Sequence, residues 1–254
     1  MSYIYEMLSA SIITITQYKR RKFIKNLCNL VRDQDYSNII EWVIVEGSKS
    51  VNEKILNKKE IDILIEYNKD IKIRYIYPSL IWNIGSLRNI GNRSCKGDII
   101  ICMDDDDYYP RDRVSHCVER LIETGLEIAG CSNMYMYDYN YEKLYKFDKF
   151  ENHSTNNCMA FKRDYLKYHR HDIDISYGEE SSFTNNFTVE MAELDPNKCI
   201  IASSHMTNTF DKKKLIKKMD NDEIYNLFEI NKDIRYFIPE LIYSNMKKII
   251  LENG

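Results

Sequence analysis

Four consecutive aspartates, at residues 104–107, follow directly on an apolar segment that ends at Met103. Without a cation these crowded carboxylates would repel one another, and some of them would have to be protonated. At the carboxyl end of a buried strand they can instead gather a hard divalent ion, which prefers oxygen ligands. Such an ion can bind a diphosphate and neutralise charge on a leaving group. The run therefore predicts a Mn2+ or Mg2+ site, with a solvated acidic loop as the alternative.

Two further carboxylates, Glu179 and Glu180, follow Gly178, where we expect a helix to begin. A carboxylate at a helix N-terminus is stabilised by the helix dipole. A hydroxyl group is a poor nucleophile that benefits from proton removal as it attacks, so one glutamate of the pair is a candidate general base. The alternative is a plain helix N-terminus, where glutamate is common in any case.

His205 lies just after a late apolar segment, among small polar residues. Histidine is a common metal ligand, which makes His205 a candidate to complete the site that the aspartates begin. A lone histidine is also often structural, and both interpretations stay open. The lysines at residues 212–214, 217 and 218 favour the solvated face of a helix, with a site for an anionic partner or a membrane surface as the alternative.

The segments that must position these residues predict an α/β fold. Buried strands are expected at residues 11–16, 42–45, 71–77 and 98–103, with helices at 20–31 and 85–95. Strands that alternate with helices imply right-handed βαβ units and a mainly parallel sheet, whose ligands bind beyond the carboxyl ends of the strands.

The second half of the chain has a less regular pattern. We expect a helix that ends at Gly125, then irregular strands at residues 127–137, 143–147, 157–161 and 199–202. Two amphipathic helices are expected after residue 211, the second at about 239–251. No internal repeat and no Gly/Ser-rich linker divides the chain, so a single catalytic domain with a helical C-terminal extension is the simplest organisation.

Composition narrows the class of protein. The 254 residues, 44% of them hydrophobic, are enough to bury the core of one α/β domain. A net charge of −3 argues against a general nucleic-acid-binding protein. The seven cysteines form no Cys-x-x-Cys pair, which indicates buried reduced thiols rather than a zinc ribbon. No segment approaches the roughly 20 apolar residues of a transmembrane helix. We therefore expect a soluble, cytoplasmic protein.

Several segments in order resemble the GT-A-fold glycosyltransferases of the family-2 type. The segments 88–92 and 97–100, the aspartate run and Pro110 resemble a strand that ends in a D-x-D element with a proline a few residues on. Residues 16–20 resemble the opening motif of that family. Residues 42–48 resemble its second strand, which usually ends in Asp-Asp-Gly-Ser.

The resemblance covers about residues 8–210 and implies the fold and its division. The expected fold is α/β of the GT-A type, with a mainly parallel central sheet flanked by helices. Residues 1–210 would form the catalytic domain, with a nucleotide-sugar-binding half at 1–110 and an acceptor half at 111–210. Residues 211–254 would form the helical C-terminal extension.

The resemblance also implies contacts with the nucleotide. Thr16 would approach the nucleotide through its backbone, and Tyr18 would lie against the base. Glu46 stands where the family often has an aspartate that hydrogen-bonds uracil, and its longer side chain leaves the identity of the donor open. Arg88 is suited to the base or to the phosphates.

The aspartates and His205 would complete the donor site. Asp104 would bind the ribose and Asp106 the metal ion. Asp105 could take either role, because a run of four leaves the register open. His205 matches a C-terminal histidine that completes the metal shell in many GT-A enzymes.

The resemblance thus implies an enzyme, a glycosyltransferase of the hexosyltransferase type. Glu180 matches the general base of the inverting members by position, and Glu179 matches its partner. The enzyme would move a sugar from a nucleotide-sugar, most simply a UDP-sugar, to a hydroxyl of a glycan or protein acceptor, with inversion and with the help of the metal ion.

Two alternatives stay open. A nucleotidyltransferase acting on sugar phosphates shares the layout and the acidic site, but it would usually show a glycine-rich loop after the first strand, where residues 17–21 contain no glycine. A non-catalytic sugar-binding relative of the same fold would keep its function without Asp106 or Glu180.

Overall fold

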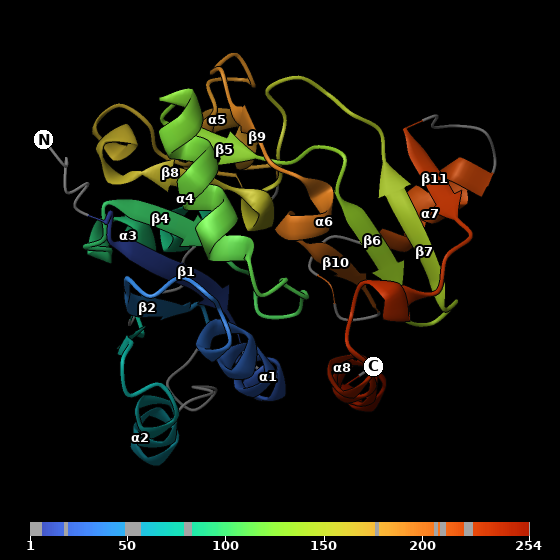
Figure 1. Cartoon of the computed structure of the whole chain (residues 1–254), viewed down its shortest axis with the longest axis horizontal. Helices are drawn as coiled ribbons and strands as arrows, with labels where there is room; N and C mark the ends of the chain where they lie inside the picture. The colour runs from blue at the N-terminus through green and yellow to red at the C-terminus, as the bar shows by residue number, and fades with distance from the viewer. Residues whose placement is uncertain are drawn as a thin grey trace, which may run out of the picture.

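The chain forms a larger and a smaller β-sheet, with helices on both faces of the larger one (Figure 1). The computed structural model describes residues 7–17, 20–48, 57–78, 83–175, 178–205, 208, 212–220 and 226–253.

Within the described residues, the larger sheet has seven strands in the order β3-β2-β1-β4-β8-β5-β9. They are β1 (Ala10–Thr16), β2 (Ile39–Glu46), β3 (Lys72–Ile76), β4 (Ile99–Cys102), β5 (Ile128–Gly130), β8 (Ala160–Lys162) and β9 (Ala192–Glu193). The first four are parallel to one another, whereas β8 runs antiparallel to both β4 and β5. The carboxyl ends of β1, β2 and β4 therefore meet at one edge of the sheet.

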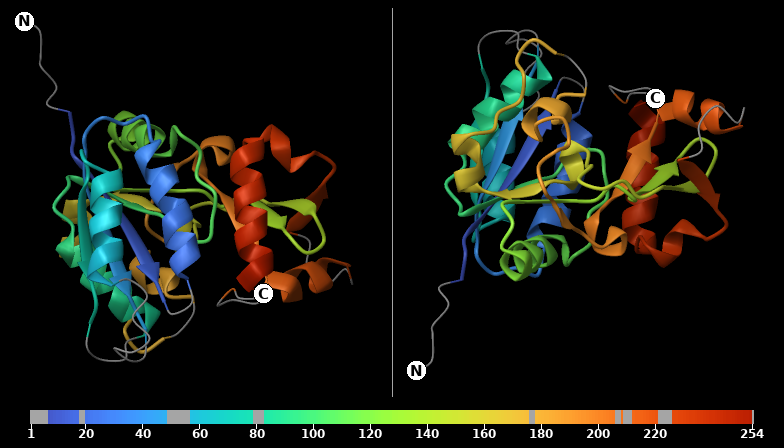
Figure 2. Two further views of the ribbon diagram at one scale, coloured as in Figure 1. Left: turned by 90° about the horizontal axis from the view of Figure 1, so that it is seen from below. Right: turned by 90° about the horizontal axis from the view of Figure 1, so that it is seen from above.

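Both faces of this sheet are covered. Successive side chains of a strand point to opposite faces, so Ile12 and Ile13 belong to different hydrophobic clusters. Helices α1 (Arg21–Arg32), α2 (Lys58–Tyr67) and α4 (Arg113–Thr124) contribute to the first cluster. Helices α3 (Ile84–Ser94) and α5 (Glu180–Phe183) contribute to the second. Figure 2 shows α1 and α2 side by side on their face of the sheet. This double cover explains why β1, β2 and β4 are buried along nearly their whole length.

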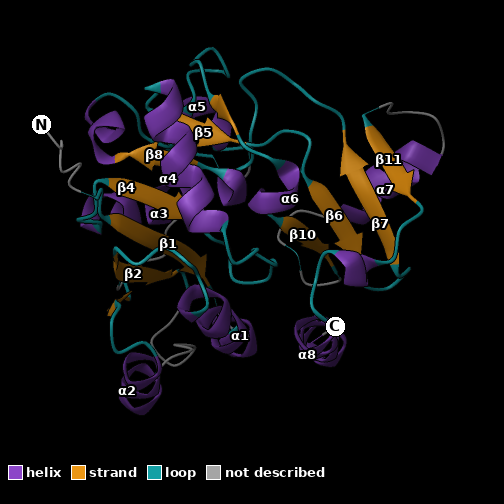
Figure 3. Ribbon diagram, in the orientation of Figure 1, coloured by secondary structure: helices purple, strands orange, loops and turns teal. Residues whose placement is uncertain are grey.

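The smaller sheet has four strands in the order β10-β6-β7-β11 (Figure 3). They are β6 (Tyr135–Asp138), β7 (Lys143–Phe147), β10 (Ile201–Ser204) and β11 (Leu227–Ile230). An isolated bridge between Tyr108 and Ile201 joins the loop after β4 to β10. Helix α7 (Lys212–Asp220) contacts β11, and α8 (Glu240–Asn253) packs against α1. The short elements are α6 (Pro196–Cys199) and the 3-10 helices η2 (Asn156–Cys158), η3 (Arg163–Lys167) and η4 (Ile234–Tyr236).

Most of the predicted elements are confirmed. The four strands of the first half are β1 to β4, and α4 ends at Gly125, whose φ of 73° suits a glycine. All seven cysteines are buried and unpaired, as expected. None of the helices in the described parts of the chain is long and apolar enough to cross a membrane.

Other elements differ from the prediction. The strand expected at residues 157–161 begins as η2, and β8 starts only at Ala160. Helix α2 was not predicted; a capping box between Asn57 and Glu60 starts it. The C-terminal segment contains the two expected helices but also β11, which pairs with β7. The domain boundary at residue 210 remains a prediction.

Candidate active site

The aspartate loop lies where β1 and β4 end side by side. Asp105, Asp106 and Asp107 are all less than 10% exposed, so the loop is not the solvated loop of the alternative interpretation. The Thr16 hydroxyl, at the end of β1, donates a hydrogen bond to Asp105 Oδ2 at 2.6 Å. Asp104 is the more open member, with its side chain 28% exposed.

Arg20 neutralises the middle of the loop. Its Nη1 lies 2.5 Å from Asp105 Oδ1 and 2.9 Å from Asp106 Oδ2. Burial raises the pKa of Asp105 to about 6, because Arg20 only partly offsets the loss of solvent and the charge of Asp106. Burial would also raise the pKa of Asp106, but Arg20 and His205 hold it well below its usual value.

His205 and Asp106 lie together, as predicted. His205 Nε2 is 3.0 Å from Asp106 Oδ2, and the imidazole stacks on Phe23 at 5.5 Å between ring centroids. The Asn208 side-chain amide donates to the same oxygen of Asp106 at 3.1 Å. The backbone N–H of His205 donates to Asn208 Oδ1 at 2.7 Å, which fixes the orientation of that amide.

The Asp106 and His205 pair fits a divalent ion. Two ligands about 2.1 Å from an octahedral ion, at right angles, lie about 3 Å apart, which is the separation of these two atoms. Within the described part of the chain, no group of three or more His, Cys, Asp or Glu side chains converges as a metal site. The remaining ligands would therefore be water and substrate oxygens, as is common for Mg2+ at phosphate sites.

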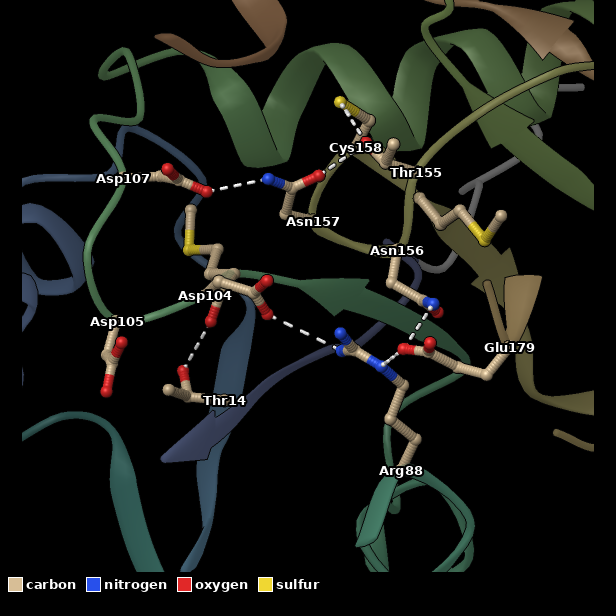
Figure 4. Close-up of polar contacts among 12 residues, drawn as sticks. Thr14, Arg88, Asp104, Asp105, Asp107, Thr155, Asn156, Asn157, Cys158 and Glu179 are labelled. Carbon is tan, nitrogen blue, oxygen red and sulfur yellow. Dashed lines mark hydrogen bonds and ion pairs between the residues drawn. The ribbon is translucent and has the colours of Figure 1, made fainter. Parts of the chain in front are cut away.

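Asp107 has a different role from its neighbours. One of its carboxylate oxygens accepts a hydrogen bond at 2.7 Å from the Asn157 side chain (Figure 4). The other accepts one at 2.7 Å from the Ser203 backbone N–H. Burial raises its pKa to about 7, although the Lys212 charge opposes this. Lys212 itself donates to the Ser203 carbonyl at 2.7 Å, so this lysine does not belong to a purely solvated face. Asp107 thus joins η2 to β10.

Arg88 links the two predicted acidic sites. Its Nε donates to Glu179 Oε1 at 2.8 Å, and its Nη1 lies 3.4 Å from Asp104 Oδ1. Figure 4 shows the guanidinium between these two carboxylates. The structure thus brings the aspartate loop and the glutamate pair into one site, with Arg88 held by protein carboxylates on both sides.

Asn156 holds both glutamates. Its side-chain amide donates to Glu179 Oε1 at 3.1 Å, and its backbone N–H donates to Glu180 Oε1 at 3.3 Å. Asn156 Oδ1 lies 2.8 Å from His171 Nε2, and this contact helps to fix the orientation of the Asn156 side-chain amide. Burial raises the pKa of Glu180, and the neighbouring Glu179 raises it further. A raised pKa brings a carboxylate closer to what a general base needs near neutral pH.

The remaining predicted contacts lie at the ends of β1 and β2. Glu46 pairs with Thr16 in the parallel register and is fully buried. Its carboxylate accepts hydrogen bonds from the hydroxyls of Ser48 and Tyr75. Tyr18 lies outside the described residues. The nucleotide contacts assigned to these residues therefore remain predictions.

Sequence reasoning missed Arg20, Asn156 and His171. Arg20 carried a signal, because it lies in the segment that resembles the opening motif and a cation at a helix N-terminus is unfavourable without a partner. Asn156 and His171 carried none, since their roles depend on contacts between segments far apart in sequence.

A sequence model of the family described as "Glycosyl transferase family 2" matches residues 11–178. Comparison with curated proteins gives no match.

Solved structures share the fold. TarS from S. aureus in complex with UDP-GlcNAc is similar at a TM-score of 0.59 and 14% identity, over 79% of this chain and 60% of that chain. The chain spans 37% of a longer TarS structure. The mannosyltransferase PcManGT from Pyrobaculum calidifontis, in complex with GDP-Man and Mn2+, gives 0.63 and 13% identity over 98% of this chain and 72% of that chain. GalNAc-T7 with UDP, GalNAc and Mn2+ gives 0.62 and 9% identity over 81% and 45% of the two chains. At these identities the likeness shows the GT-A fold.

Proposed function

We propose, from the premise that the chain belongs to glycosyl transferase family 2, that it moves a sugar from a UDP-sugar to an acceptor hydroxyl on a glycan or protein. The observation that carries this proposal is the chain of contacts Asp104–Arg88–Glu179. It holds the loop suited to a diphosphate beside the glutamates suited to deprotonating a hydroxyl. A binding protein without catalysis would have no need of that arrangement.

The donor would lie at the carboxyl ends of β1, β2 and β4. Thr16 and Asp104 would contact the nucleoside, and Glu46 would face a uracil. Asp106 and His205 would hold Mn2+ or Mg2+, which when bound neutralises the departing diphosphate. The structures of TarS and GalNAc-T7 with UDP support the choice of nucleotide, whereas the complex of PcManGT with GDP-Man makes guanine the competitor to test.

The acceptor would lie over α5. Glu180 would take the proton of the attacking hydroxyl, and displacement from the face opposite the diphosphate would invert the anomeric carbon. Glu179 is held by Arg88 and Asn156, and its charge contributes to the raised pKa of Glu180. Glu179 would thus tune the base rather than replace it.

Donor hydrolysis tests the proposal without knowledge of the acceptor. The full chain is incubated with UDP- and GDP-sugars, and nucleotide release is followed with Mn2+ or with EDTA. We expect release of UDP from one donor, its loss with EDTA, and its loss in Asp106→Ala but not in the exposed Asp148→Ala control. Release of GDP alone would overturn the choice of uridine. Pyrophosphate formed from a nucleoside triphosphate and a sugar phosphate would identify a nucleotidyltransferase instead.

A further inference from the structure

Asp106 Oδ2 is the most crowded acceptor atom of the site. Arg20 Nη1 lies 2.9 Å from it, His205 Nε2 3.0 Å and Asn208 Nδ2 3.1 Å. The two oxygens of a carboxylate together offer about four lone-pair directions, so a single oxygen with three neighbours of this kind is already saturated. A metal ion that binds Oδ2 must displace at least one of them.

Arg20 is the neighbour that a metal ion would displace. Asn208 is neutral and its amide is fixed by the His205 backbone, while His205 can turn its ring nitrogen toward the ion as a ligand. Arg20 carries a full positive charge in a site that is largely shielded from water, where a second cation on the same oxygen is repelled strongly.

Arg20 has a second anchor that lets it move without leaving the site. Its contact with Asp105 Oδ1, at 2.5 Å, does not involve Asp106. Arg20 also directly precedes the twelve-residue helix α1, whose first turn contains no acidic residue. The dipole at the start of a helix attracts anions, and a planar guanidinium binds phosphate oxygens in pairs.

We propose that Arg20 and the divalent ion compete for Asp106, and that binding of the ion transfers Arg20 from Asp106 to the diphosphate of the donor. The inference rests on the proposed function for the ion and the diphosphate, and extends it to a residue with no assigned role. Without metal, the positive charge of Arg20 offsets the repulsion between the carboxylates of Asp105 and Asp106. With metal and nucleotide together, the displaced guanidinium gains a new anionic partner. Metal and nucleotide therefore each strengthen the binding of the other.

Electron paramagnetic resonance of free Mn2+ measures the competition directly, without an activity assay. The Kd of Mn2+ is determined for the full chain alone and with saturating UDP. Arg20→Gln removes the charge but keeps hydrogen bonding to Asp105, Arg20→Lys keeps the charge, and Arg21→Gln is the control at the adjacent, half-exposed arginine that pairs with Glu60.

In Arg20→Gln we expect Mn2+ alone to bind about tenfold more tightly than in the unmodified chain, with the gain on adding UDP reduced by a similar factor, which is within the usual range of coupling between sites. Arg20→Lys and Arg21→Gln should behave like the unmodified chain. Equal or weaker Mn2+ binding by Arg20→Gln, with Mn2+ bound normally by the unmodified chain, would overturn the competition and leave the proposed function standing. Failure of every chain to bind Mn2+, even with UDP, would instead overturn the proposed metal dependence and this inference with it.

A second measurement needs no variant. In a crystal structure of the unmodified chain with Mn2+ and UDP, Arg20 should contact a phosphate oxygen and should have left Asp106 Oδ2. An Arg20 that still lies within hydrogen-bond distance of that oxygen beside a bound ion would overturn the inference.

Discussion

On one side of the site the functional side chains come from the ends of regular parallel strands, and on the other side irregular segments hold them. The aspartate side comprises Thr16, Arg20, the loop 104–107 and His205. The glutamate side comprises Glu179, Glu180, Asn156 and His171. Thr16 is the last residue of β1 and the loop follows β4, whereas Asn156 lies in η2 and Glu180 begins a four-residue helix.

The two sides also balance charge differently. Asp105 and Asp106 each contact a guanidinium; the pKa of Asp106 is lowered, whereas burial still raises the pKa of Asp105 to about 6. Glu180 accepts a hydrogen bond from the backbone N–H of Asn156, and the pKa of Glu180 is raised. A carboxylate that stays ionised suits the binding of cations, while one that exchanges protons readily suits acid–base work. The contrast between Asp106 and Glu180 is consistent with the proposed roles, in which Asp106 binds a cation and Glu180 takes a proton.

The largest effect is expected from Glu180→Gln, which removes the proposed base and leaves the aspartate side untouched. We expect the rate of sugar transfer to fall about 10³-fold, within the range for loss of a general base. The Kd of UDP with Mn2+, measured by calorimetry, should not change. The matched control is Glu190→Gln at an exposed position, which should transfer sugar at the normal rate. If Glu180→Gln transferred sugar at a rate within a factor of three of normal, Glu180 would not be the base. The proposed difference between the two sides would then be wrong.

Arg88→Met breaks the link between the sides. It leaves Asp104 and Glu179 without their shared cation, and removal of one partner of a buried ion pair costs about 3 kcal/mol or more. We expect urea denaturation to show this loss in the free energy of unfolding. Arg163→Met removes an exposed arginine 3.9 Å from Asp98 and should cost well under about 1 kcal/mol. Equal stability of the two variants would mean that Arg88 does not hold the sides together.

The pH dependence of transfer reports on the glutamate side. A general base works only when ionised, so the rate should fall as the pH drops through the pKa of Glu180. Since burial and the charge of Glu179 raise that pKa, the fall should begin at a higher pH than for an exposed glutamate. Glu179→Gln removes the neighbouring charge and should move the fall to lower pH, as measured in a pH–rate profile. A profile that moves the other way would exclude electrostatic tuning by Glu179.

Asn156→Ala tests whether the amide merely positions the glutamates. The backbone N–H to Glu180 remains, whereas the side-chain contacts with Glu179 and His171 are lost. We expect kcat to fall about tenfold, less than the roughly 100-fold that a 1 Å misplacement can cost, with the KM of the donor unchanged. Asn29→Ala, on the exposed face of α1, provides the control. A rise in the donor KM with constant kcat would place Asn156 on the aspartate side instead.

The smallest effect compares two glycines with similar backbone geometry. Gly125 and Gly178 have φ values of 73° and 70°, and an added Cβ would meet nothing within 4 Å at either. Each Gly→Ala change should therefore cost only about 1 kcal/mol of backbone strain, measured by thermal unfolding. Gly178→Ala should also lower the transfer rate, because it directly precedes the glutamate pair, whereas Gly125→Ala should not.

The position of the aspartate side could be predicted from the sequence because β1, β2 and β4 are rich in isoleucine and valine. Segments such as β1 and β2 are buried along nearly their whole length, and the aspartates follow β4 closely in the chain. Topology then brings Thr16 to the loop, since β1 and β4 are neighbouring parallel strands. Glu179 and Glu180 were found by their position after Gly178, although the helix there has only four residues.

The contacts that complete the site lie beyond such reasoning. Asn156 was placed just before a predicted strand, where η2 in fact holds it, and a single asparagine has no periodic signal. Arg88 was assigned to the nucleotide, and its bridge between Asp104 and Glu179 depends on residues 16 and 91 positions away. Strand β11 was missed because it has only four residues, interrupted by Glu229, which is too short for a clear strand pattern.

Strand β11 has a consequence for any attempt to isolate the first 210 residues. It covers β7 along residues 144–147, so a chain cut before it would present the bare N–H and C=O groups of β7 to solvent. Uncovered strand edges pair readily with other chains. Such a shortened protein should therefore self-associate. In the full chain, β11 protects this edge of the small sheet from pairing with other molecules.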